Sequence, residues 1–230
     1  MCEQEKILNI NKPYGMSSCG VTEYIKKRFF PGQKVGHAGT LDPWATGVLL
    51  VCVGKATKKV CELMELEKEY EGEMVLGIST DTQDAAGKVV KKINAQNIGK
   101  EEVERVFEKF RGEIFQTPPM YSALRYKGKR LYELAREGKV VERQPRRVNI
   151  YELRILKFIP GDYPGVKFRV VCSRGTYIRT LVHEIGELLG CGAHLSSLTR
   201  TRIGDFSIEN SIDLERIHLE YGNNSWIEQG

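Results

Sequence analysis

The sequence has no long run of apolar residues and no recognisable targeting segment. Its longest apolar stretch, Val48 to Val53, is far too short to cross a bilayer. The first six residues are polar and include acids, which argues against a secretion signal or a transit peptide. Internal repeats, low-complexity tracts and Gly/Pro/Ser-rich linkers are also missing. We therefore expect a cytoplasmic protein with no membrane association; a nuclear or organellar address is the alternative for a eukaryotic source.

Cysteine and histidine are sparse, and their spacing does not predict a metal site. None of the six cysteines forms a C-x-x-C pair, and no two of the four histidines lie three to five residues apart. Cys52 and Cys172 fall in apolar, strand-like runs, where a small buried hydrophobic residue is usual. In a reducing compartment these cysteines are expected to be free thiols. We expect neither a metal nor a redox cofactor.

The composition, 41% hydrophobic and 28% charged over 230 residues, is that of a folded globular protein. Hydrophobic periodicity predicts helices near 20–29, 100–111 and 176–189, the last with Thr176 as N-cap, and strands near 6–10, 48–53, 70–76, 148–159 and 166–173. Helices and strands mix without a strict βαβ rhythm. The expected fold is α+β, with a largely antiparallel mixed central sheet flanked by helices in one domain, 1–230. The tail, Ile208 to Gly230, is expected to form one short helix and nothing more.

Positive charge is concentrated in one segment. Residues 125–147 hold nine Lys/Arg and three Glu, a net charge of +6 in a chain whose total is +5. A basic segment in an otherwise neutral protein indicates a polyanion partner, although a solvated surface helix is the alternative. Tyr126 and Tyr132 interleave with the charges, which suits stacking on unpaired bases.

The segment from Gly36 to Leu49, GHAGTLDPWATGVL, places one carboxylate in a glycine-rich loop before an apolar strand. Gly36, Gly39 and Gly47 permit positive φ and close approach of another backbone or a ligand. Pro43 disfavours a helical conformation at Asp42. Such a loop can hold a single side chain in a set direction. Taken alone, the Leu-Asp-Pro tripeptide more often forms an ordinary turn before a strand.

A second motif, Ser173 to Leu181, joins a predicted strand to a predicted helix. It places Arg179 in the first helical turn, where the helix dipole disfavours a cation. An arginine there favours a carboxylate partner, and Asp42 is one candidate, because a bidentate pair would hold that acid ionised and oriented. The alternative is a surface arginine paired with any nearby glutamate.

Five motifs in order resemble the TruB-type tRNA pseudouridine synthases. They are the GHAGTLDP segment, GTYIRT at 175–180, KPYGMSS at 12–18, KEYEG at 68–72 and PPMYSALRYKGKRLY at 118–132. The resemblance extends from about residue 6 to residue 206. It implies a pseudouridine synthase fold in which residues of about 118–147 form an RNA-binding thumb-like insertion.

The resemblance also implies roles for single residues. Asp42 would be the essential catalytic residue, Tyr70 would stack on the flipped base and assist proton transfer, and Arg179 would pair with Asp42. Substrate contacts would be made by His37, Tyr177, Leu198, Asp84 and Lys12, and phosphate contacts by Arg125, Lys127, Lys129 and Arg130. The implied reaction needs the base outside the stack. It converts uridine to pseudouridine in the T-loop of tRNA without a cofactor, with Asp42 attacking the nucleoside or removing a sugar proton.

Two alternatives remain open. A guide-RNA-dependent synthase resembling dyskerin acts inside a ribonucleoprotein, but that subgroup lacks the thumb-like insertion. A tRNA-binding or tRNA-folding chaperone on the same scaffold would not need the catalytic residues and could coexist with catalysis. Many bacterial members of the family continue into a C-terminal RNA-binding (PUA) domain, which we do not expect here, so RNA binding would be weaker or would rest more on the insertion. A monomer is expected, because no coiled-coil seam is evident.

Overall fold

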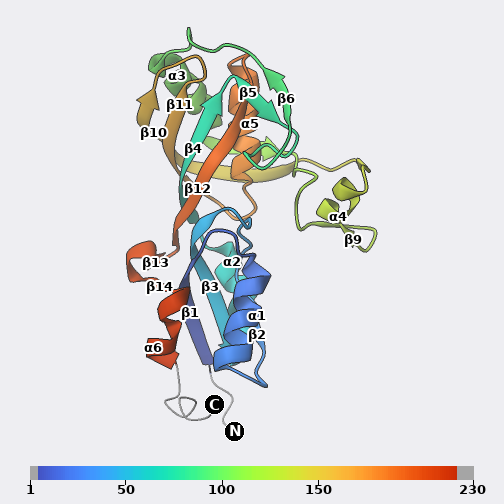
Figure 1. Ribbon diagram of the computed structural model, residues 1–230, viewed down its shortest axis with the longest axis vertical. Coiled ribbons are helices and arrows are strands. Elements are labelled where there is room, and N and C mark those ends of the chain that lie inside the picture. The colour runs from blue at the N-terminus through green and yellow to red at the C-terminus, as the bar shows by residue number, and fades with distance from the viewer. Residues whose placement is uncertain (1–4, 222–230) are drawn as a thin grey trace, which may run out of the picture. The chain divides into compact units, whose positions relative to one another are not determined.

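The computed structural model describes residues 5–221 and divides into two compact units (Figure 1). Unit 1 consists of Met1–Tyr70 and Leu198–Gly230, and unit 2 consists of Glu71–Ser197. Two strands, β4 (Lys68–Leu76) and β12 (Ala193–Ile203), contribute residues to both units. None of the helices in the described range is long and apolar enough to span a membrane. The single-domain assignment for 1–230 stays a prediction.

In unit 1 the strands follow the order β14, β1, β3, β12, with β2 paired to β3 and β13 to β12. β1 and β3 are antiparallel, whereas β14 pairs with β1 and β12 with β3 in parallel. The remaining bounds are β1 Glu5–Lys12, α1 Ser18–Phe29, β2 Val35–His37, β3 Thr46–Gly54, η1 Lys55–Lys59, α2 Val60–Glu65, β13 Phe206–Ser207, η2 Ile208–Asn210, β14 Ile212–Asp213, η3 Leu214–Arg216 and α6 Ile217–Tyr221.

Helix α1 packs on the sheet of unit 1, as Figure 1 shows. Its apolar residues Val21 and Ile25 are fully buried against Ile10 and Leu49 of β1 and β3. Ser17 is the N-cap of α1, since its side chain accepts a hydrogen bond of 3.0 Å from the backbone N–H of Gly20. This cap directs the chain from β1 into α1 and places the KPYGMSS turn at the start of the helix.

The prediction for the tail was wrong in its described part. Residues 208–221 contain two 3₁₀ turns, the short strand β14 and helix α6. β14 pairs with β1 through Ile10 and Ile212, more than 200 residues apart in the chain. Such a pairing leaves no local pattern in the sequence. Residues 222–230 lie outside the described range.

In unit 2 the strands follow the order β12, β4, β11, β10, β7, and β10 is antiparallel to both β11 and β7. Helices α3 and α5 belong to this unit (Figure 1). Its remaining bounds are β5 Ile78–Thr80, β6 Val89–Lys92, α3 Lys100–Phe110, β7 Gly112–Gln116, β8 Arg125–Tyr126, β9 Lys129–Arg130, α4 Leu131–Arg136, β10 Arg146–Ile159, β11 Gly165–Cys172 and α5 Ile178–Leu188. The α+β class and the largely antiparallel arrangement are confirmed.

The helix predicted for 176–189 begins later than expected. Tyr177 occupies the N-cap position, and α5 starts at Ile178. The Thr176 hydroxyl donates to the carbonyl of Ser173 at 2.9 Å, within the turn that precedes the helix. Thr176 is therefore not the N-cap, because its side chain stabilises the turn instead. Arg179 does lie in the first helical turn, as predicted.

The insertion predicted at about 118–147 is a structured excursion from unit 2. It contains the hairpin β8–β9 and the short helix α4, which project from the rest of the unit in Figure 1. Lys127 and Gly128 form the turn and both have positive φ, 47° and 88°. Two consecutive positive φ values are typical of a type I′ hairpin turn.

The five cysteines in the described range are free thiols, as predicted, and Cys52 and Cys172 are buried.

Candidate functional site

The loop that carries Asp42 is held at both neighbouring residues. The hydroxyl of Ser18 accepts from the backbone N–H of Leu41 at 2.9 Å and donates to the carbonyl of Leu41 at 3.1 Å. On the other side, the N–H of Gly15 donates to the carbonyl of Pro43 at 2.8 Å. The KPYGMSS turn therefore clamps the residues before and after a half-buried Asp42. Such anchoring restricts the directions that the carboxylate can take.

Lys12 is buried beneath this loop. Its side chain has no exposed surface, and its Nζ donates to three carbonyls, those of Pro13, Met16 and Pro43, at 2.8, 2.7 and 3.1 Å. Burial lowers the pKa of Lys12 to about 8, partly offset by the charge of Asp42 and reinforced by the charge of Arg200. Lys12 thus ties the turn to the Asp42 loop, and a contact with substrate stays a prediction.

The lowered pKa of Lys12 predicts a pH-dependent contribution to stability. The ordinary value is 10.5, so between about pH 8 and pH 10.5 the unfolded chain binds more protons at Lys12 than the folded chain does. The contribution of Lys12 to the free energy of unfolding therefore increases as the pH rises from about 8 to 10.5. Scanning calorimetry of wild type and Lys12→Met should show wild type gaining Tm relative to the variant from pH 8 to pH 10. Lys58→Met, which removes an exposed lysine, controls for loss of charge. A Tm difference that stays constant over this range would contradict the assignment.

Two glycines of the motif have the predicted positive φ, and one of them, Gly47, also allows the predicted close approach. Gly39 and Gly47 have φ of 97° and 100°. A Cβ on Gly47 would lie 2.2 Å from the carbonyl oxygen of Arg200, on the neighbouring strand β12. Gly36 differs, since its φ is not positive and a Cβ there would have no neighbour within 4 Å. Gly47 is therefore required for the parallel pairing of β3 with β12.

Sequence reasoning missed Arg200. This residue is 1% exposed, and its guanidinium carbon lies 6.0 Å from the centre of the Tyr70 ring. Tyr70 is buried on β4, and Leu198 is buried two residues before Arg200 on β12. A signal was present, because the alternation of β12 places an arginine at an inward position two residues after Leu198.

His37 ends β2 and is half-buried, with its Nε2 3.8 Å from Sγ of Cys19.

In unit 2, Arg179 is also buried and is surrounded by oxygen acceptors. Its guanidinium donates to the carbonyls of Thr82 and Tyr121 at 3.1 and 2.8 Å, and Nη1 lies 3.6 Å from Oδ2 of Asp84. The other Asp84 oxygen accepts from the Thr82 hydroxyl at 2.6 Å and from the N–H of Ala86 at 3.1 Å. The Ala86 contact makes Asp84 an Asx-turn residue. The pairing of Arg179 with Asp42 and the contact of Asp84 with RNA stay predictions.

Tyr177 is positioned by a glutamine that the sequence did not reveal. The buried amide of Gln116 accepts from the N–H of Tyr177 at 3.0 Å and donates to its carbonyl at 3.3 Å. The reciprocal pair fixes the backbone before α5 and leaves the Tyr177 side chain half-buried. Nothing in the local sequence marks Gln116, because its partner lies 61 residues away.

The four residues that were predicted to contact phosphates lie on the insertion. Arg125, Lys127 and Lys129 are exposed, and Arg130 is half-buried. Two tyrosines carry cations over their rings: Lys127 lies 5.5 Å from the centre of Tyr126, and the ring of Tyr132 has an arginine 5.4 Å away. The surface combines cations with aromatic faces, which suits RNA.

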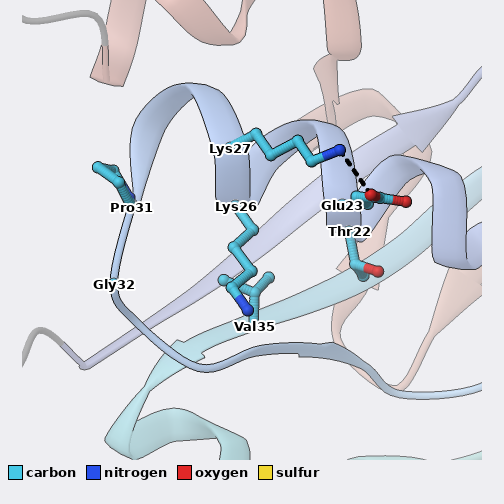
Figure 2. A pocket seen from close by; sticks show the side chains of 7 residues that line it. All are labelled: Thr22, Glu23, Lys26, Lys27, Pro31, Gly32 and Val35. Atoms are coloured by element: carbon cyan, nitrogen blue, oxygen red, sulfur yellow. Dashed lines mark ion pairs between the residues drawn. The ribbon is translucent and has the colours of Figure 1, made fainter.

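A surface hollow of about 560 Å³ lies beside the C-terminal half of α1, as Figure 2 shows. Lys26 and Lys27 line it, and Lys27 forms an ion pair of 2.7 Å with Glu23. Cations are favourable in the last turn of a helix, so these lysines have a local explanation. The hollow contains none of the residues predicted for the reaction.

Two family models together match most of the chain. The model of the TruB family pseudouridylate synthase N-terminal domain matches residues 27–178. That of the tRNA pseudouridylate synthase B C-terminal domain matches residues 179–228. The chain belongs to the TruB family of pseudouridylate synthases. The predicted resemblance is thereby confirmed.

Relatives of this TruB-family chain include tRNA pseudouridine synthase B from Clostridium tetani and from Clostridioides difficile, each 50% identical. The matches cover 93% and 95% of this chain and 73% and 72% of the relatives. Among solved structures, a Cbf5–Nop10–Gar1 complex contains a chain that is 34% identical, with a TM-score of 0.70 over 93% of this chain. Our chain spans about half of that chain's length, 54%. The pseudouridine synthase fold is thus confirmed, and the roles of single residues in this TruB-family chain stay predictions.

Proposed function

We propose that this protein converts uridine to pseudouridine in the T-loop of tRNA, with Asp42 as the catalytic carboxylate. The observation that carries this proposal is the anchored Asp42 loop: Ser18 and Gly15 bind the residues on either side of a half-buried carboxylate. Membership of the TruB family, and 50% identity to proteins named tRNA pseudouridine synthase B, support the reaction and the RNA class.

The reaction is an isomerisation, so every heavy atom of the base is retained and only hydrogen exchanges with solvent. The C1′–N1 bond breaks, the base turns, a C1′–C5 bond forms, and the C5 proton leaves to solvent while N1 gains one. Asp42 attacks the nucleoside or removes a sugar proton, and both routes require its ionised form. Tyr70 supplies a platform for the extruded base, His37 fills the vacated space, and Arg179 pairs with Asp42. Tyr177 and Leu198 line the uracil pocket, and stacking offsets part of the cost of base extrusion.

The decisive experiment is tritium release from an unmodified tRNA transcript that carries tritium at C5 of uridine. Wild type should release tritium, and a transcript with cytidine at the T-loop position should release none from that site. Release from both transcripts would move the target elsewhere in the RNA. Tight binding without release would favour the guide-RNA-dependent alternative or a binding protein.

Two observations favour the stand-alone enzyme over the guide-RNA-dependent alternative. The curated relatives are 50% identical, against 34% for the chain in the Cbf5–Nop10–Gar1 complex. The insertion with β8, β9 and α4 is also present.

A refolding assay of misfolded tRNA with Asp42→Asn tests the chaperone alternative, since chaperoning should survive loss of catalysis. We expect the enzyme to act as a monomer, in the cytoplasm, without a metal.

The insertion should supply part of the RNA affinity through charge. Lys127 and Lys129 are exposed, and Lys129 forms a surface ion pair of 3.2 Å with Glu137. Replacement of the two lysines therefore disturbs no buried packing. Lys127→Ala/Lys129→Ala should weaken tRNA binding by about 10-fold near 0.1 M salt and reduce the log–log salt slope by about 1.5 to 2. Filter binding across salt concentrations measures both. Lys109→Ala/Lys157→Ala, two exposed lysines elsewhere in unit 2, is the matched control. An unchanged slope in the first variant would remove the insertion from the RNA interface.

A further inference from the structure

We propose that Arg200 is a positioning residue of the reaction site, which holds the Asp42 loop and the Tyr70 ring in one fixed arrangement. The inference rests on the proposed function for its consequence in catalysis, and on unit 1 alone for its geometry. None of the five sequence motifs that resemble the family includes this residue.

The side chain of Arg200 bridges the two ends of the loop. Its Nε donates to the carbonyl of Val48 at 2.7 Å, and Nη2 donates to the carbonyl of Gly39 at 3.1 Å. These two carbonyls bracket the segment that contains Asp42. One planar group therefore fixes the separation of the two ends, which a main-chain turn alone would leave adjustable.

The backbone of Arg200 holds the same loop from a second direction. Arg200 pairs with Gly47 and Thr199 with Thr46 in the parallel ladder of β12 and β3. The hydroxyls of Thr46 and Thr199 add a contact of 2.9 Å. Gly47 has no side chain, so the two backbones approach closely at the point where the loop becomes a strand. Backbone and side chain of one residue thus restrict the loop together.

The guanidinium also faces the second predicted catalytic residue. The Tyr70 ring centre lies 6.0 Å from its carbon, within the range of a cation–π contact. The charges of Asp42 and Arg200 act in opposite directions on the pKa of buried Lys12, and Arg200 is itself buried. Burial of a cation among carbonyls costs desolvation free energy. An arginine at this position therefore indicates that its charge and its rigid planar group contribute to positioning the loop and the ring.

The test compares Arg200→Met and Arg200→Lys. Methionine removes the charge and the planar guanidinium at similar side-chain volume, whereas lysine keeps the charge but not the planar group. Single-turnover tritium release should fall about 100-fold in Arg200→Met, because a small displacement of a reacting group has effects of that size. The tRNA Kd should stay within about threefold of wild type, because Arg200 is buried. Arg200→Lys should recover part of the rate. Hydrogen exchange at 39–48 should be faster in Arg200→Met, independently of any activity.

Arg202→Met is the matched control. This residue lies on the same strand but binds Glu67, Glu69 and the carbonyl of Gly204, away from the loop. It should keep the wild-type rate and the wild-type exchange at 39–48. A normal rate in Arg200→Met overturns the proposal. So does a parallel loss of rate, affinity and Tm that Arg200→Lys does not relieve, since that pattern indicates a merely structural role. Absence of release by wild type would instead refute the proposed function, while the exchange data would still decide whether Arg200 holds the loop.

Discussion

Replacement of Asp42 by asparagine is expected to abolish tritium release while tRNA binding persists. Asparagine keeps the size and the hydrogen-bonding shape of the side chain but cannot ionise, so it can neither attack the nucleoside nor remove a proton. The main-chain anchors from Ser18 and Gly15 do not involve the carboxylate, so the loop should fold normally. We expect the single-turnover rate to fall by at least about 10³-fold. Filter binding with the same transcript should give a Kd within about threefold of wild type.

Asp205→Asn is the control for this variant, because Asp205 is an exposed acid of unit 1 outside the predicted site. It should match wild type in both measurements. Loss of binding together with loss of rate in Asp42→Asn would contradict a purely catalytic role for Asp42. A rate that stayed within 10-fold of wild type would exclude Asp42 as the reacting group altogether.

A single methyl group on Gly47 is expected to have the largest effect on stability. Its φ of 100° disfavours any L side chain, and the added Cβ would lie 2.2 Å from the carbonyl oxygen of Arg200. The clashing atoms are backbone, so relief requires separation of β3 from β12. Gly47→Ala should lower the free energy of unfolding by more than about 4 kcal/mol, beyond what most single substitutions do. Urea denaturation followed by circular dichroism measures the change.

Gly36→Ala supplies the contrast within the same motif. Its φ is not positive, and the new Cβ meets nothing within 4 Å. Its unfolding free energy should stay within about 1 kcal/mol of wild type. Equal stabilities for the two variants would mean that the close approach of Gly47 to Arg200 does not hold in solution.

Local patterns in the sequence were sufficient for most of the regular structure. Periodicity predicted a strand near 70–76 and a helix near 100–111. The observed strand buries Tyr70, Met74 and Leu76, and the observed helix buries Val103, Val106 and Phe107. Both results follow because side-chain spacing along one element depends on that element's own geometry. The cap of α5 was misplaced because the Thr176 hydroxyl had a competing acceptor in the preceding turn.

The sequence by itself determined the family, the Asp42 loop and the glycines that the loop requires, because neighbouring residues set turn geometry. Only the tertiary structure revealed what holds the loop. Ser18 contacts Leu41 across 23 positions, and Arg200 contacts Gly39 across 161. Lys12 was predicted to contact the substrate, and its complete burial and its bond to the carbonyl of Pro43 were not evident from the sequence. Contacts between distant segments depend on which elements pack together, and no single-sequence pattern records that choice.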